Sequence, residues 1–214
     1  MEQRRFAIVG HRAPPSGKII LNDLAGGSGR LDVLCRAVNT ALFVSHGIRQ
    51  DSHVTLHLLG GEGPTRRIWF DGNELRGVRV DERSIAGNIA RVLGNPVPPL
   101  GQWPSISPGI RHSGGGLAET LSDWQREDVE LYALAADAPA LWVDEGKLTN
   151  EKRELGRIGF FLSDDQPFTD DENDMLSDYC ALRSLGDEWL QGHVVIALVH
   201  QLLDLGVELN TGNN

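Results

Sequence analysis

A small-residue loop at residues 26–29 runs directly into the clearest amphipathic helix of the chain. From residue 31 onward, apolar side chains recur at three- and four-residue spacing, as one buried face of a helix requires. The residues of this stripe are Leu31, Leu34, Cys35, Val38 and Leu42. Arg30 lies where the helix begins, and Ser28 is placed to cap it. The stretch therefore predicts a helix over residues 31–42 with one buried face.

A second face of this helix has an unusual set of polar residues. Asp32, Arg36 and Asn39 fall together on it at helical spacing, followed by Phe43. A mostly solvated helix would be expected to have lysine and glutamate there, so an acid, an amide and arginines indicate a functional site. The alternative is a solvated face on which Asp32 and Arg36 form an i,i+4 ion pair. The residues alone leave both interpretations open.

Strand-like and helical patterns alternate along the chain, which is typical of an α/β fold. The expected strands are residues 5–9, 54–59, 67–70, 130–134, 159–162 and 181–184. The expected helices are residues 31–42, 82–93, 116–124, 169–178 and 190–205, with Asp81 and Thr169 as caps. The turn at residues 60–64 predicts a hairpin, and residues 95–116 are expected to form a long loop. The last helix is apolar enough to be buried on most sides.

Composition limits where the protein works. No apolar run is long enough to span a membrane, and residues 1–6 lead straight into a strand-like segment rather than a signal peptide. Cys35 and Cys180 do not make a disulfide framework. We therefore expect a reducing, cytoplasmic setting and no membrane partner.

The charge is distributed unevenly between the two halves of the chain. The formal net charge of −10 argues against a general nucleic-acid binder. Residues 1–116, however, have 14 Lys and Arg against 9 Asp and Glu, and all but three of the 20 cations in the chain are arginine. Arginine suits phosphate and base-edge recognition, although a GC-rich genome also favours its codons. Any RNA contact is therefore expected from the N-terminal half.

Several familiar sites are disfavoured. Residues 26–30 lack the Lys-Ser/Thr of a P-loop, and no strand precedes a well-placed GxGxxG. No HExxH, CxxC or GxSxG occurs, so neither a metal site nor a serine hydrolase is expected. His193, His200 and Asp204 share a helix face, which favours a structural hydrogen bond in the core or at a dimer contact.

Longer motifs resemble a known family. They are Gly29-Arg30-Leu31-Asp32-x-Leu34-Cys35-Arg36, Ser45-His46-x-Ile48-Arg49-x-Asp51, Asp81-Glu82-Arg83 and Ser107-Pro108-Gly109-Ile110. Together they resemble the TrmY-type pseudouridine N1-methyltransferases, over residues 6–204. The resemblance implies one SPOUT-class domain over residues 1–210, with a parallel-rich α/β sheet flanked by helices and a C-terminal trefoil knot. It also implies a homodimer, an RNA-recognition half at 1–116 and a cofactor half at 117–207.

The resemblance implies methyl transfer from S-adenosylmethionine to N1 of a pseudouridine in RNA, in particular position 54 of the tRNA T-loop. Asp32 would act as base or orienter, with Arg30 and Arg36 beside it, and no metal would be needed. Arg49, His46, Arg83 and Asp81 would contact the substrate. The alternative for Asp81 and Arg83 is an ion pair that holds the second helix.

The cofactor site is implied by the same resemblance. Its residues would be Leu134, Leu162, Ser163, Leu185, Gly186, Leu190 and Val195. Ser163 departs from a common family glycine, and Asp187-Glu188-Trp189 and Val194-Val195 depart from common family residues. Two other functions therefore remain open: a methyltransferase for another pseudouridine, such as one in ribosomal RNA, or an inactive RNA-binding or assembly protein on the same fold.

Overall fold

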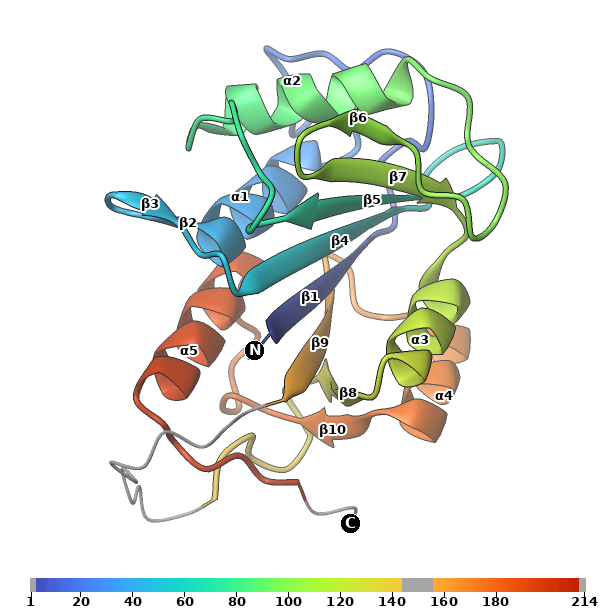
Figure 1. The fold of residues 1–214 in the computed structure, drawn as a ribbon. Helices are drawn as coiled ribbons and strands as arrows, with labels where there is room; N and C mark the ends of the chain where they lie inside the picture. The colour runs from blue at the N-terminus through green and yellow to red at the C-terminus, as the bar shows by residue number, and fades with distance from the viewer. Residues whose placement is uncertain (1–2, 144–155, 212–214) are drawn as a thin grey trace.

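An eight-stranded sheet forms the centre of the molecule in a computed structural model, which describes residues 3–143 and 156–211 (Figure 1). The strands of this sheet are β1 (Gln3–Gly10), β4 (Ser52–Leu58), β5 (Arg66–Asp71), β6 (Ser105–Ser107), β7 (Ile110–Gly114), β8 (Val129–Leu134), β9 (Arg157–Ser163) and β10 (Ala181–Arg183). The helices are α1 (Leu31–Leu42), α2 (Glu82–Leu93), α3 (Leu117–Arg126), α4 (Asp170–Tyr179) and α5 (Gly192–Asp204). A separate two-stranded hairpin consists of β2 (Phe43–Val44) and β3 (Gly47–Ile48).

The sheet has a parallel half and an antiparallel half. Its strand order is β10-β8-β9-β1-β4-β5-β7-β6. The pairs from β10 to β4 are parallel, and those from β4 to β6 are antiparallel. The parallel-rich α/β sheet and the β4–β5 hairpin predicted from sequence are thus confirmed. Because the parallel strands run in one direction, their carboxyl ends meet at one edge, where ligands bind in open α/β sheets.

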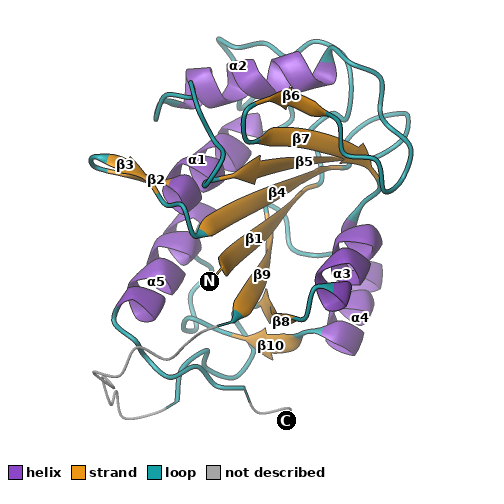
Figure 2. Cartoon of the chain, viewed as in Figure 1, coloured by secondary structure: helices purple, strands orange, loops and turns teal. Residues whose placement is uncertain are grey.

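Helices cover both faces of the sheet (Figure 2). On one face, α1, α2 and α5 pack over the apolar side chains of β1, β4, β5 and β9 around Phe6, Leu56 and Phe160. On the other face, α3 and α4 pack over the β8–β9 region around Trp124 and Phe161. None of the helices in the described residues is long and apolar enough to cross a membrane.

Two of the three predicted helix caps are confirmed. Asp81 accepts a hydrogen bond from the Ser84 amide at 2.8 Å, and Thr169 forms a capping box with Glu172. The prediction for Ser28 is wrong, because the N-cap of α1 is Arg30. The Ser28 hydroxyl instead accepts a hydrogen bond from the Ile20 amide at 2.8 Å. Ser28 therefore closes the preceding loop and leaves the first turn of α1 without a side-chain cap.

The structure corrects two further expectations. Residues 95–116 are not one long loop, because they contain β6 and β7, which extend the sheet beyond β5. Their prolines and glycines concealed strands that form through pairing with β5 rather than through local propensity. Helix α5 is not buried on most sides, since Val194, Leu198 and Leu205 remain exposed along one face.

Candidate active site

A cavity of about 390 Å³ opens at the edge where β8 and β9 end. Leu134 and Leu162 contribute apolar surface from the ends of these strands, and the loop at residues 163–167 forms one side. The segment at residues 189–192 and Val195 of α5 form another side. The cavity size lies within the range of small-molecule and cofactor sites.

The first turn of α1 meets this cavity with a cluster of one acid and two arginines. Arg30 lines the cavity and donates two hydrogen bonds to Asp32, at 3.0 and 3.3 Å. Arg36 donates to the same carboxylate, and it reaches Gln191 of the cavity at 3.5 Å. Asp32 is only 6% exposed, so the predicted polar face of α1 is neither empty of contacts nor freely solvated. The i,i+4 pair exists, but as part of a larger cluster.

Asp32 is held in its ionised form. Burial alone would raise its pKa, but the hydrogen bond from Arg30 and the charges of Arg30 and Arg36 outweigh burial and lower it. A carboxylate with a lowered pKa is a weak proton acceptor. A role in which Asp32 orients two guanidinium groups is therefore favoured, rather than a role as general base.

The glycine loop places Arg30 by an unusual backbone path. Gly29 has φ +61°, and a Cβ atom there would lie 2.0 Å from the Arg12 carbonyl oxygen. Arg30 follows with φ 59° and ψ 32°, which is the left-handed region. Left-handed non-glycine residues are strained and recur at functional sites. The glycine is required because the loop passes directly against the backbone that follows β1.

His11, which the sequence did not single out, fixes the loop on one side of the cavity. Its Nδ1 lies 2.9 Å from Asp164 Oδ1, and its Nε2 lies 2.9 Å from Glu172 Oε2. The backbone amide of His11 also donates to Asp164 at 2.9 Å. The contacts with Asp164 and then Glu172 raise the pKa of His11 to about 9. A polar residue one position after a buried strand was the signal in the sequence.

These contacts predict a pH-dependent contribution to stability. The pKa of His11 rises from 6.5 to about 9 on folding, so its contribution is complete below pH 6.5 and disappears as the pH rises through 9. We expect His11→Gln to lower the free energy of unfolding by about 2 kcal/mol at pH 6.5 and by much less at pH 10. Urea denaturation across this range measures it. His46→Gln, in the exposed β2–β3 turn, is the control, and an equal His11→Gln deficit at both pH values would contradict the prediction.

The structure brings together only part of the predicted site. Five of the seven expected cofactor residues line the cavity, together with Arg30; the five are Leu134, Leu162, Ser163, Leu190 and Val195. Leu185 and Gly186 are not among its lining residues. The acids at its wall are Asp164 and Asp165 rather than Asp187 or Glu188. Residues 165–167 were missed because only the fold shows that their loop faces α1 and α5.

The expected substrate residues lie elsewhere. Arg49 binds Asp204 of α5 through two hydrogen bonds, at 2.6 and 3.2 Å. His46 lies in the exposed turn between β2 and β3. Arg83 donates to the Asn22 side chain at 2.6 Å, and Asp81 caps α2. These two side chains therefore do not form the Asp81–Arg83 ion pair considered above.

The remaining acid–histidine pattern of α5 is structural. His200 is buried, and its Nε2 lies 3.1 Å from the Ala41 carbonyl oxygen of α1. Asp204 binds Arg4 of β1 at 2.6 Å. Burial lowers the pKa of His200 to about 4, which keeps the ring neutral. Within the described residues, no three His, Cys, Asp or Glu side chains lie close enough together to hold a metal ion.

The cavity suits a cofactor with an apolar ring and a charged tail. Leucine, valine and tryptophan side chains form its apolar walls, and Arg30 and the acids Asp164 and Asp165 lie at its polar side. Trp189 is 75% exposed, which leaves an indole face available to a planar ring. The residues present therefore fit a nucleoside that has both ionic and apolar parts.

The chain is similar to known proteins over nearly its whole length. A relative from Haloferax volcanii, named tRNA (pseudouridine(54)-N(1))-methyltransferase, is 38% identical over 206 residues, covering 94% of this chain and 96% of its own. A protein of the same name from Methanospirillum hungatei is 35% identical over 198 residues, covering 92% of this chain and 94% of its own.

Among solved structures, Archaeoglobus fulgidus Nep1 bound to S-adenosylhomocysteine shares the fold. The TM-score is 0.64 at 13% identity, and the match covers 96% of this chain and 99% of Nep1. A family model described as "Putative SAM-dependent RNA methyltransferase" matches residues 3–206. With nearly the whole chain matched, this protein belongs to that family of S-adenosylmethionine-dependent RNA methyltransferases.

Proposed function

We propose that this protein methylates N1 of pseudouridine 54 in the tRNA T-loop, with S-adenosylmethionine as methyl donor. The observation that supports it most is the cluster of Arg30, Asp32 and Arg36 at the mouth of a cofactor-sized cavity. Its relatives from Haloferax volcanii and Methanospirillum hungatei are named for this reaction.

The cavity residues would hold the cofactor. Leu134, Leu162 and Val195 would pack against its adenine and methionine parts. When bound, S-adenosylmethionine supplies an electrophilic methyl group on a sulfonium. Leu185 and Gly186 belong to this proposal only as neighbours of the segment at residues 189–192, since they do not line the cavity.

The two arginines would act on the substrate ring. The N1–H of pseudouridine is a weak acid and must lose its proton as the methyl group is transferred. Positively charged donors stabilise the negative charge that develops on the ring, and they lower the pKa of the N1–H. Asp32 would hold Arg30 and Arg36 in position, and the proton would pass to solvent. The target nucleotide must leave its stack to reach the methyl group.

The two halves of the chain would divide the work. Residues 1–116, which have the excess of arginine, would recognise RNA, and residues 117–207 would hold the cofactor within one domain of residues 1–210. His46 and Arg83 are exposed and remain candidates for phosphate or base contacts. Arg49 and Asp81 would act indirectly, by fixing α5 and the start of α2.

A C-terminal trefoil knot is part of the proposal. Segments that are far apart in sequence lie against each other at this end of the molecule. The Leu141 amide donates to the Ser184 carbonyl oxygen at 2.8 Å, and the Asn210 amide donates to that of Leu141 at 2.8 Å. Contacts of this kind between distant segments are expected of a threaded tail.

Cys35 and Cys180 are both free and buried, which supports the reducing, cytoplasmic setting.

A homodimer through α5 is the proposed assembly. Val194, Leu198 and Leu205 recur at helical spacing on its exposed face, with Trp189 and Leu190 exposed just before it. A second copy would cover this apolar surface, because isologous pairing places the same face on both partners. The arrangement would bring the cavity of one subunit near the arginine-rich half of the other.

The assembly predicts a clear effect of charge on the α5 face. Leu198 is 40% exposed, so Leu198→Glu should leave the fold intact and abolish dimer formation. Size-exclusion chromatography with light scattering measures the mass. Val80→Glu places the same charge on another exposed apolar residue and should leave the dimer unchanged. A wild-type protein that elutes as a monomer at all concentrations would exclude the proposed dimer.

Nucleoside mass spectrometry tests the reaction. Purified protein is incubated with S-adenosylmethionine and a tRNA transcript that has pseudouridine at position 54, and methylpseudouridine is the expected product. Methylation of ribosomal RNA but not tRNA would favour the other substrate. A calorimetric titration with S-adenosylmethionine that gives no heat would favour an RNA-binding protein that has lost the cofactor.

A further inference from the structure

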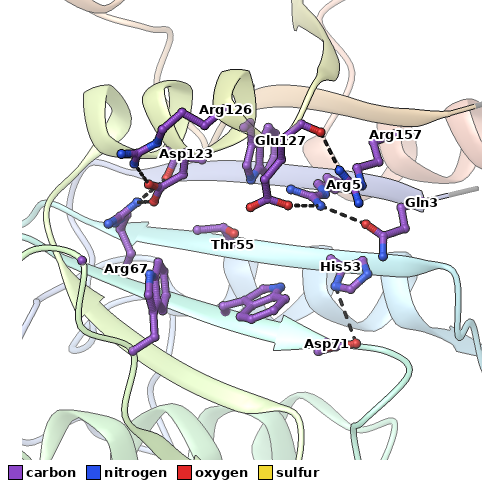
Figure 3. Close-up of a pocket in the computed structure, with 15 residues that line it drawn as sticks. Gln3, Arg5, His53, Thr55, Arg67, Asp71, Asp123, Arg126, Glu127 and Arg157 are labelled. Atoms are coloured by element: carbon purple, nitrogen blue, oxygen red, sulfur yellow. Dashed lines mark hydrogen bonds and ion pairs between the residues drawn. The ribbon is translucent and has the colours of Figure 1, made fainter.

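A second cavity, of about 580 Å³, lies on the face of the sheet away from α1 and α5 (Figure 3). Its floor is formed by alternate residues of β1, β4 and β5, which are Arg5, His53, Thr55, Arg67, Trp69 and Asp71. Trp103, Trp124 and Glu127 form its walls. We call this cavity the sheet-face pocket, and no step of the proposed reaction uses it.

The floor of the sheet-face pocket is unusually polar. Central strands of a mostly parallel sheet are normally apolar on both faces. Here Arg67 is 1% exposed, and Arg5, His53 and Thr55 are also buried. Burying so many polar groups is costly unless they are hydrogen-bonded or paired. Three tryptophans beside them supply flat apolar surface.

The charged groups of the pocket are already paired with one another (Figure 3). Arg5 donates to Glu127 at 2.7 Å, and Arg67 donates to Asp123 at 2.8 Å. Arg157 donates to the Glu127 carbonyl oxygen at 2.6 Å. Since these guanidinium groups have carboxylate or carbonyl partners, the pocket offers little to a phosphate and favours an uncharged ligand.

Two buried polar atoms of the floor have no hydrogen-bond partner among the residues that the structure describes. One is Arg5 Nε, a donor, and the other is His53 Nδ1. The nearest acid to His53 Nδ1 is Asp71 Oδ1, at 3.6 Å, which is too long for a hydrogen bond. Burial lowers the pKa of His53, so the ring is neutral and can accept as well as donate. Both atoms are buried, so the floor side chains would have to shift slightly before a ligand edge with donors and acceptors could satisfy them.

We propose that the sheet-face pocket binds a nucleobase, presented by an unpaired RNA residue or by a free nucleotide. A nucleobase is planar and uncharged, its edge has donors and acceptors, and its faces stack on tryptophan. The volume of about 580 Å³ is sufficient for a nucleotide.

The nucleobase in this pocket is not the one that is methylated. The pocket includes Gln3 and Arg5 at the start of β1, whereas the cofactor cavity lies where the parallel strands end. The two cavities also lie on opposite faces of the sheet, because Val33 of α1 and Val195 of α5 line the cofactor cavity. If the bound base comes from RNA, this inference rests on the proposed function. If it comes from a free nucleotide, it does not.

Calorimetric titration with UMP, CMP, AMP and GMP tests the proposal, with ribose 5-phosphate as the ligand that lacks a base. At least one nucleotide should bind and ribose 5-phosphate should not. Trp103→Ala, in a connecting segment, should weaken binding about tenfold, because stacking on an aromatic ring is lost. Trp189→Ala, the same change in the cofactor cavity, should leave nucleotide affinity unchanged. Thr55→Val, which keeps the side-chain volume and removes a hydroxyl group of the floor, is the second variant.

Filter binding of a tRNA transcript identifies the source of the base. A tenfold loss of tRNA affinity in Trp103→Ala assigns the pocket to RNA, and a loss confined to mononucleotides assigns it to a free nucleotide. The proposal is overturned if neither ligand binds, if ribose 5-phosphate binds as well as the nucleotides, or if both pocket variants bind like wild type. S-adenosylmethionine affinity should not change in Trp103→Ala or Thr55→Val, so a failed cofactor site and a failed sheet-face pocket give different results.

Discussion

Asp32→Asn is expected to lower turnover about a thousandfold while the affinity for S-adenosylmethionine changes less than threefold. The Asp32 carboxylate holds two guanidinium groups, and a neutral amide in its place cannot. Arg30 and Arg36 would therefore separate and leave the developing charge on the substrate ring unstabilised. Single-turnover methylation of a pseudouridine-containing tRNA measures the rate, and calorimetry measures cofactor affinity. If Asp32→Asn retained turnover, Asp32 would have no role in the reaction.

A double-mutant cycle separates the two roles of Asp32. If Asp32 acts by holding Arg36, then Asp32→Asn combined with Arg36→Gln should be little worse than Asp32→Asn alone. If Asp32 accepts the proton itself, the two losses should approach additivity. Glu74→Gln is the matched control, because Glu74 also binds an arginine, Arg111 at 2.7 Å, but lies outside the cavity.

Gly29→Ala is expected to lower the free energy of unfolding by about 3–4 kcal/mol and the melting temperature by roughly 6–16 °C. The alanine would be forced into a left-handed conformation, with its Cβ 2.0 Å from the Arg12 carbonyl oxygen. Backbone atoms cannot move aside as a flexible side chain can, so the loop itself must shift. Thermal and urea denaturation measure the loss.

The same substitution should also disturb the site, because Gly29 directly precedes Arg30. We expect weaker cofactor binding in Gly29→Ala at temperatures where the protein is still folded. Gly87→Ala is the control of opposite sign: it lies inside α2 with nothing within 4 Å of the added Cβ, and it should stabilise the protein by about 1 kcal/mol. Unchanged stability of Gly29→Ala would mean that the loop packs less closely than the structure shows.

Local patterns predicted the secondary structure where the chain alone determines it. The apolar stripe of α1 and the caps of α2 and α4 depend on residues three or four positions apart, and these elements form as expected. β6 and β7 were missed because they form by pairing with β5, and pairing partners cannot be read from a proline-rich segment. The long motifs around residues 29–36 identified the family, which the comparisons confirm.

The polar floor of the sheet-face pocket shows the same limit. His53 and Thr55 alternate with apolar residues in β4, which is a pattern that the sequence displays. Alternation alone predicts that such side chains face solvent. Only the packing of Trp103 and Trp124 over them shows that they are buried around a cavity.

The sequence by itself determined the α/β class, most of its helices and strands, and the likeness to a family, because each depends on neighbouring residues or on long motifs. Tertiary structure alone decided which charged groups meet across different elements. It brought the local cluster of Arg30, Asp32 and Arg36 beside the cofactor cavity, and it paired Arg49 with Asp204. An ion pair depends on which side chains the fold brings within about 4 Å, and sequence spacing gives no measure of that distance between elements.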